Sequence, residues 1–364
     1  MKKISYLLGL LAIGTALTFN ACTKDTETET ERESILPSSF RIDIPSSISS
    51  TELNRSTTDD VLNGNDIYGH LRNFIAVGEE SGRIVESIIF AINVYHINQA
   101  MSINYTSDED NRQKNLVVVE NVTFEGKTYE FKLTVTDALS EGNADGGKAL
   151  QVFWNRSPIE GISILKPYNI NRTENTTQQN AIFRVDYSEN SSFGYDKHMI
   201  VSIADLSNDN ADNYYVDNLK MFVGKTGDII EVYGNSNHPN ANFFTNDTGF
   251  DWAFVASSDR TENIGVAEVG LPSNMLNSSD RAIILDTNSL RNIFNDQIIE
   301  MGYAQADVDN YLQNTEAPGY FNNGGFVQGG TAPTTDDYSV IKSRIDNLTP
   351  YNPTDIRNLS IAFD

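Results

Sequence analysis

Cys22 is the only cysteine of the chain, and its surroundings predict a specific chemistry for its thiol. Lys2 and Lys3 give a positive start, residues 6–18 form an apolar stretch, and Ala21 is a small residue directly before the cysteine. The stretch is shorter than the roughly 20 residues of a membrane-spanning helix, which is typical of a cleaved export signal. We therefore expect cleavage after Ala21 and lipidation of Cys22 by a diacylglycerol thioether and an N-linked fatty acyl chain such as palmitate.

The residues around the cysteine resemble those of a known class of lipoproteins. Residues 19–22, Phe-Asn-Ala-Cys, keep a small residue before the cysteine but lack the Leu of the usual lipobox, and so resemble the looser lipobox of Bacteroidota-type surface lipoproteins. The acids that follow at every second position resemble the export tag of such proteins: Glu27, Glu29, Glu31 and Glu33. This resemblance covers about the first tenth of the chain. It implies a lipid anchor in the outer membrane, with the cell surface favoured over the periplasmic face.

Residue types that carry enzyme chemistry do not form a familiar motif in this sequence. There is no Gly-x-Ser-x-Gly elbow, no His-Glu-x-x-His and no phosphate-binding loop. No pair of the four histidines, His70, His96, His198 and His238, has the short spacing that places two imidazoles on one metal ion. We expect a non-catalytic protein without a cofactor. A hydrolase with dispersed carboxylates stays an alternative, because sequence alone does not measure the separation of two carboxyl groups.

Two stretches rich in Asp and Asn could offer oxygen ligands to calcium, namely residues 205–213 and residues 108–111. Calcium binds several carboxylate and carbonyl oxygens, but neither stretch has the glycine and the closing glutamate of an EF-hand loop. Solvated turns are therefore the favoured prediction for both stretches, and calcium is the alternative.

Tyr320, Phe321 and Phe326 are the candidate ligand-binding residues. They lie in a loop predicted over residues 317–333, where glycines and amide side chains surround them. Aromatic faces can stack on a sugar or a peptide while amides select it by hydrogen bonds. The alternative is that Tyr320 and Phe326 fold back into the sheet as core residues and the glycines only permit that path.

The charge of the chain restricts its partners. The formal net charge of −24 at pH 7 repels nucleic acid phosphates and acidic lipid head groups, so nucleic acid is excluded as a partner. We expect the membrane to be contacted through the lipid anchor, and the further partner to be an outer-membrane protein, a glycan or a peptide.

Hydrophobic periodicity predicts three regions in the chain. Residues 1–21 are the signal peptide, residues 22–58 an acidic, Ser- and Thr-rich tether, and residues 59–364 a single globular domain. Within the tether, Phe40 to Ile44 alternates apolar and polar and predicts a short strand at the sheet edge. The domain is predicted to contain helices over 66–99 with a break at Gly78 and Gly82, strands over 115–287 ending with Ala282 to Leu285, and helices over 289–314.

Short connections between the strands predict antiparallel neighbours. The fold class is therefore α+β, with a long antiparallel β meander curved like a half-barrel and helices that bury their apolar stripes on it. A β-sandwich is the alternative. In outline this architecture resembles carriers of the LolA and LolB type, although no residue carries that resemblance.

Three functions follow from these expectations. The first is a lipid-anchored, non-catalytic envelope protein that binds a ligand or an outer-membrane partner, as an accessory to nutrient uptake. The second is a carrier of lipid or lipoprotein, which requires an apolar cavity of several hundred Å³. The third is the carboxylate-dependent hydrolase.

Overall fold

A long series of antiparallel strands in sequence order is the main feature of the structure, a computed structural model that describes residues 39–51, 61–93, 97, 99–174, 179–191, 193–206, 215–241 and 249–364. The chain divides into two compact units. The described part of unit 1 comprises residues from 39–41, 80–190 and 361–364, and that of unit 2 comprises residues from 42–79 and 191–360.

The described residues of unit 1 form six strands, and consecutive strands pair antiparallel. They are β2 (Met101–Thr106), β3 (Gln113–Phe124), β4 (Lys127–Asp137), β5 (Lys148–Arg156), β6 (Ile159–Leu165) and β7 (Ile182–Ser188). Glu125 and Gly126 connect β3 to β4, and both have positive φ angles, 48° and 79°, as the tight hairpin turn requires. Along β4, buried side chains lie at every second position from Tyr129, in agreement with the alternation of apolar and polar residues in the sequence.

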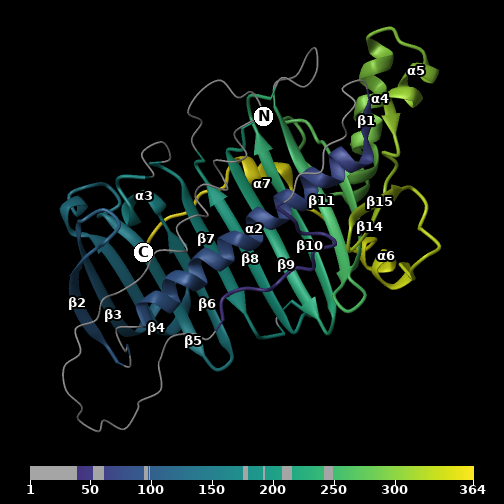
Figure 1. Cartoon of the computed structure of the whole chain (residues 1–364). Helices are drawn as coiled ribbons and strands as arrows, with labels where there is room; N and C mark the ends of the chain where they lie inside the picture. Colours follow the sequence, from purple (N-terminus) through teal and green to yellow (C-terminus); the bar gives the residue numbers. More distant parts are fainter. Residues whose placement is uncertain are drawn as a thin grey trace. The chain divides into compact units, whose positions relative to one another are not determined.

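Seven strands of the meander lie in the described part of unit 2, again paired antiparallel (Figure 1). They are β8 (Lys197–Ala204), β9 (Asn218–Thr226), β10 (Ile229–His238), β11 (Phe250–Asp259), β12 (Ile264–Gly270), β14 (Gly319–Asn322) and β15 (Gly325–Gly329). A separate parallel pair joins β1 (Leu62–Asn63) to β13 (Leu312–Gln313). The strand order is open at both ends, which confirms the α+β class with a long antiparallel meander.

Helix α2 (Gly64–Asn93) is continuous over 30 residues, with its first part in unit 2 and its second part in unit 1. The predicted break at Gly78 and Gly82 is wrong. Gly78 serves close packing, because a Cβ added to it would lie 2.2 Å from Cε of Met221. Glycine weakens a helix by about 1 kcal/mol, which favourable contacts along 30 residues can offset. None of the described helices combines the length and the apolar character needed to cross a membrane.

Residues 39–51 of the expected tether are packed onto α2, and the predicted strand from Phe40 to Ile44 is absent. In unit 1, the Phe40 backbone N–H donates to Glu86 at 3.2 Å. In unit 2, the Ile44 backbone N–H donates to Glu79 at 3.0 Å. Helix carboxylates therefore satisfy backbone donors that a sheet edge was expected to satisfy. The other residues of the tether lie outside the described residues.

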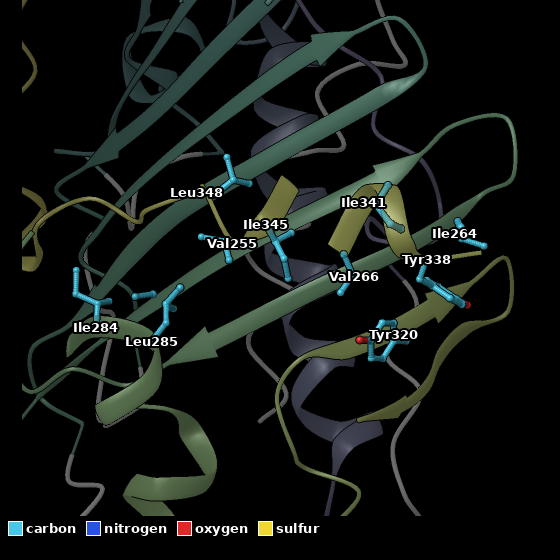
Figure 2. Packing of buried hydrophobic residues seen from close by; sticks show 11 residues of the cluster. Val255, Ile264, Val266, Ile284, Leu285, Tyr320, Tyr338, Ile341, Ile345 and Leu348 are labelled. Carbon is cyan, nitrogen blue, oxygen red and sulfur yellow. The ribbon is translucent and has the colours of Figure 1, made fainter. Parts of the chain in front are cut away.

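The core of unit 2 on one sheet face is covered by α6 (Ser339–Ile345) and by a helical turn, η3 (Ala282–Thr287), as Figure 2 shows. The buried side chains are those of Ala253, Val255, Ile264, Val266, Ile284, Leu285, Tyr320, Tyr338, Ile341, Ile345 and Leu348. The strand predicted from Ala282 to Leu285 is wrong. Its apolar residues cover the sheet instead of extending it, a choice that a short apolar run leaves open.

Helices α4 (Leu290–Glu300) and α5 (Gln305–Tyr311) confirm the helices predicted over 289–314. The Ser289 hydroxyl accepts a hydrogen bond from the Asn292 backbone N–H, so Ser289 is the N-cap of α4. Burial of their apolar stripe on the sheet was wrongly predicted, since only Leu290 of α4 and Val308 of α5 are buried. A last helix, α7 (Pro353–Arg357), precedes the C-terminal residues.

Candidate functional site

The three aromatic residues predicted to bind a ligand do not form one exposed surface. They belong to the β14–β15 hairpin, so the predicted loop over residues 317–333 is wrong at these positions. Tyr320 is buried on the α6 face, with its ring centroid 5.1 Å from that of Tyr338 (Figure 2). Phe321 is buried on the opposite face against Tyr68, and Phe326 stacks on Tyr68 at 5.0 Å. The core alternative describes these residues better than ligand binding does.

Several other expectations concern residues outside the described part of the chain. The lipidation residue Cys22 lies there, and so do residues 207–213 of the first calcium candidate. In the second candidate, Asp110 is buried and accepts a hydrogen bond from Lys114 Nζ at 2.9 Å, so its carboxylate serves an ion pair. Among the described residues, no group of three or more Asp, Glu, His or Cys side chains could hold a metal ion.

Unit 1 contains an apolar cavity, whose volume can be compared with the volume that a lipid carrier needs. It measures about 20 Å³ and is lined by Ser81, Ile84, Ile88, Leu165, Pro167, Ile170 and Phe183. A volume of this size has room for about one water molecule. An acyl chain needs several hundred Å³, so this cavity is not a lipid site.

A row of aromatic side chains crosses β8–β10 on the sheet face that also carries α6. We call it the aromatic strip, and it consists of Phe193, Tyr195, Phe222, Tyr233 and Tyr351. Phe222 is central, with ring centroids 5.9 Å from Phe193, 5.3 Å from Tyr195 and 4.8 Å from Tyr233. Tyr351 extends the row from Tyr233 at 5.3 Å. Cross-strand register establishes the face, because Phe222 pairs with Tyr233 and Tyr233 with Val255 of the α6 core.

The strip is buried at its centre and exposed to solvent at one end. Phe222 is buried, whereas Phe193 exposes 59% of its surface. Tyr195, Tyr233 and Tyr351 are partly buried. At the exposed end, His198 makes an edge-to-face contact with Phe193, and their ring centroids are 4.6 Å apart. An exposed ring held by a buried aromatic neighbour offers a hydrophobic face in a defined position.

Tyr195 lies directly over Gly224. A Cβ added to Gly224 would lie 2.5 Å from two carbons of the Tyr195 ring, so the ring occupies the space that any side chain there would need. Gly224 pairs with His198 on β8 and with Glu231 on β10. The side chains of these two neighbours therefore flank the Tyr195 ring on the same sheet face.

Glu231 fixes the outer end of the Tyr195 side chain. The Tyr195 hydroxyl donates to one carboxylate oxygen of Glu231, and the guanidinium of Arg344 contacts the other oxygen at 2.8 Å. Burial, the hydrogen bond to Glu231 and the charge of that carboxylate raise the pKa of Tyr195 above its usual range. The phenol therefore stays protonated and keeps donating. Both oxygens of Glu231 have a partner, which makes Glu231 a positioning residue for Tyr195.

The opposite end of the strip carries a cation. Lys220 Nζ lies 4.5 Å from the ring centroid of Tyr351, within the range of a cation–π contact. Burial raises the pKa of the neighbouring Tyr233. The strip thus combines aromatic rings with an ammonium group at one end and a guanidinium–carboxylate pair near the other. Such a surface can bind a ligand by stacking and by hydrogen bonds at its margins.

Sequence reasoning missed this strip, although part of its signal is visible. Phe222 and Gly224 on one strand, and Glu231 and Tyr233 on the next, are two residues apart, which places each pair on one face. The turn at Gly227, with a φ of 59°, sets the register that brings the pairs together. No local sequence pattern indicates that Arg344 contacts Glu231 or that Tyr351 packs on Tyr233.

The comparisons with known proteins identify no relative. No family model, no curated protein and no solved structure matches this chain.

Proposed function

We propose that this chain is a lipid-anchored, non-catalytic protein of the outer membrane that binds a ligand through the aromatic strip, as an accessory to nutrient uptake. The observation that carries the proposal is the Tyr195 ring held over Gly224 and bonded to Glu231 beside the exposed Phe193. Rings fixed on a sheet lose little conformational freedom on binding, which favours affinity. The anchor part of the proposal is supported by the sequence around Cys22.

The chemistry of the strip favours a neutral sugar as the ligand. A pyranose ring has apolar C–H faces that stack on aromatic rings and hydroxyl edges that hydrogen-bond to charged groups such as those of Arg344 and Lys220. The net charge of −24 disfavours anionic ligands. A neutral glycan is therefore the proposed ligand class.

Affinity electrophoresis through gels that contain soluble starch, mixed-linkage β-glucan, mannan or xylan tests the ligand. We expect at least one polysaccharide to retard the protein, and Phe193→Ala to weaken the retardation at least tenfold. Leu139→Ala is the matched control, because Leu139 exposes 72% of its surface and belongs to unit 1, which contains no residue of the strip. Absence of retardation by all four polysaccharides, or equal effects of the two variants, contradicts the proposed ligand class.

Metabolic labelling with radioactive palmitate tests the anchor. The natural chain should incorporate label and stay with the membrane fraction, whereas Cys22→Ala should do neither. Protease treatment of intact cells then tests the membrane face, since a surface protein is degraded and a periplasmic one is protected. A labelled Cys22→Ala variant contradicts the proposed site of lipidation.

The two alternative functions have less support. The carrier needs a large apolar cavity, whereas the one described in unit 1 measures about 20 Å³. The hydrolase needs a free carboxylate near bound substrate, whereas Glu231 in the strip is held by Tyr195 and Arg344.

A further inference from the structure

The α4–α5 hairpin leaves a large part of its apolar surface exposed. In Figure 1 the two helices stand beside the sheet of unit 2 near the β1–β13 pair. Gln305 Nε2 donates to Asn295 Oδ1 at 2.8 Å, and Arg291 contacts Asp309 at 3.1 Å, so polar contacts join the helices to each other. The interior of a helical hairpin is normally apolar.

The turn of this hairpin concentrates the exposed apolar side chains. Met301 and Tyr303 expose 58% and 57% of their surfaces, and Ile299 exposes 40%. These three residues lie within five consecutive positions, and Tyr311 on α5 is also exposed. Single exposed apolar residues need no explanation, but several together at the end of a projecting element are typical of an interaction site. Met and Tyr are among the residue types that interfaces enrich.

Acidic residues flank this apolar turn in the sequence. Asp296, Glu300, Asp307 and Asp309 are exposed on the same two helices. Arg291 is the one basic residue of positions 290–312, and its guanidinium already contacts Asp309 and Glu316. The hairpin therefore presents an apolar centre with a negative margin.

We propose that the turn of the α4–α5 hairpin docks into a second protein whose surface has an apolar groove edged by Lys or Arg side chains. Charge complementarity decides the occupant. An anionic membrane surface would repel the net negative charge of the hairpin, and a second copy of the chain would bring another net charge of −24 against it. A basic margin on the partner instead speeds association and fixes orientation, while the apolar centre supplies affinity. This docking does not depend on ligand binding by the aromatic strip.

Site-specific photocrosslinking tests the docking in cells that produce the full chain. Benzoylphenylalanine replaces Tyr303, and in a matched control it replaces Met275, which exposes 84% of its surface elsewhere in unit 2. The crosslinked peptide of the captured protein is sequenced. We expect a single protein captured from position 303 and not from 275, with the crosslink in an apolar segment flanked by at least two basic residues.

Binding between the purified partner and variants of the chain completes the test. The double variant Met301→Ser/Tyr303→Ser should weaken the Kd at least tenfold, and Asp296→Asn/Glu300→Gln should weaken it about threefold to tenfold and reduce its dependence on salt. Met275→Ser should leave the Kd unchanged, and equal melting temperatures show that the variants remain folded. A crosslink to lipid, to a second copy or to an acidic segment, or no specific product at position 303, overturns the proposal. Unchanged affinity of the Met301→Ser/Tyr303→Ser variant overturns it as well.

Discussion

The Tyr195 ring rests on Gly224, in a space that exists because position 224 has no side chain. This relationship connects a turn preceding β8 to the C-terminal half of β9, and it positions the Tyr195 hydroxyl for its hydrogen bond to Glu231. The aromatic strip therefore depends on the glycine at position 224 as well as on its aromatic residues.

Gly224→Ala should displace the Tyr195 ring and impair both stability and ligand binding. The added Cβ would lie 2.5 Å from ring carbons, closer than any real contact, and overpacking of this kind costs about 1–3 kcal/mol. Urea unfolding measures the free energy of unfolding, and affinity electrophoresis measures binding. Gly142→Ala is the control, because nothing lies within 4 Å of its added Cβ. Equal results for the two variants would show that the ring is not held as described.

Asp251 should make unit 2 less stable as the pH rises from about 4 to 7. Burial raises the pKa of Asp251 to about 7, although Arg357 at 2.8 Å and Asn237 favour the charged form. The pKa of an unfolded Asp is about 3.9, so in this interval the folded state holds a proton that the unfolded state has lost. The contribution of Asp251 is fully present below pH 4 and falls by on the order of 1 kcal/mol per pH unit up to pH 7.

Urea unfolding of the natural chain and of Asp251→Asn at several pH values measures this effect. The other acids titrate in both proteins, so the difference between the two slopes isolates Asp251. We expect the natural chain to lose more stability than the variant between pH 4 and 7. Parallel pH profiles would contradict the prediction.

Asp137→Ala should strongly destabilise unit 1. Asp137 is fully buried, and its carboxylate accepts hydrogen bonds from Arg112 Nε at 2.9 Å and from the Ser140 hydroxyl at 2.8 Å. Removal of one partner of a buried ion pair costs about 3–5 kcal/mol, because the remaining charge loses its counterion. Glu130→Ala is the matched control, since Glu130 pairs with Arg156 at the surface and such pairs contribute about 0–1 kcal/mol.

The pH dependence of Asp137 has the opposite sign to that of Asp251. Burial alone would raise its pKa, but the hydrogen bonds from Arg112 and Ser140 outweigh burial and lower the pKa of Asp137 overall. Its contribution is present above the unfolded pKa of about 3.9 and is lost as the pH falls through the folded value. Asp137→Ala should therefore lose less stability than the natural chain on acidification below pH 4. A cost of Asp137→Ala equal to that of Glu130→Ala would refute the buried pair.

Phe321→Ala should reduce stability without reducing ligand affinity per folded molecule. Phe321 is fully buried and packs edge-to-face on Tyr68, and truncation of a buried Phe costs about 3–5 kcal/mol. Val327→Ala, on the exposed side of the same hairpin, is the control and should cost much less. Loss of polysaccharide binding by Phe321→Ala at unchanged stability would restore the hairpin as the ligand-binding element.

The sequence by itself determined the class of the fold and most of its elements. Alternation from Tyr129 along β4, the Glu125–Gly126 turn and the Ser289 N-cap are local signals, because each depends on residues within one element or one turn. The charge, the single cysteine and the missing catalytic motifs are likewise properties of the chain alone. These features sufficed for an antiparallel meander with flanking helices.

Only the tertiary structure decided which side chains are buried and which act together. The sequence predicts a helix break at Gly78, whereas in the structure this glycine makes room for Met221. The sequence also predicts a loop around Tyr320, whereas in the structure Tyr320 belongs to the β14–β15 hairpin and packs in the core under α6. Arg344 reaches Glu231 across more than a hundred residues of sequence, so no local pattern could pair them. The physical reason is the same in each case: periodicity reports the face on which a side chain lies, whereas burial and partnership depend on what the rest of the chain packs onto that face.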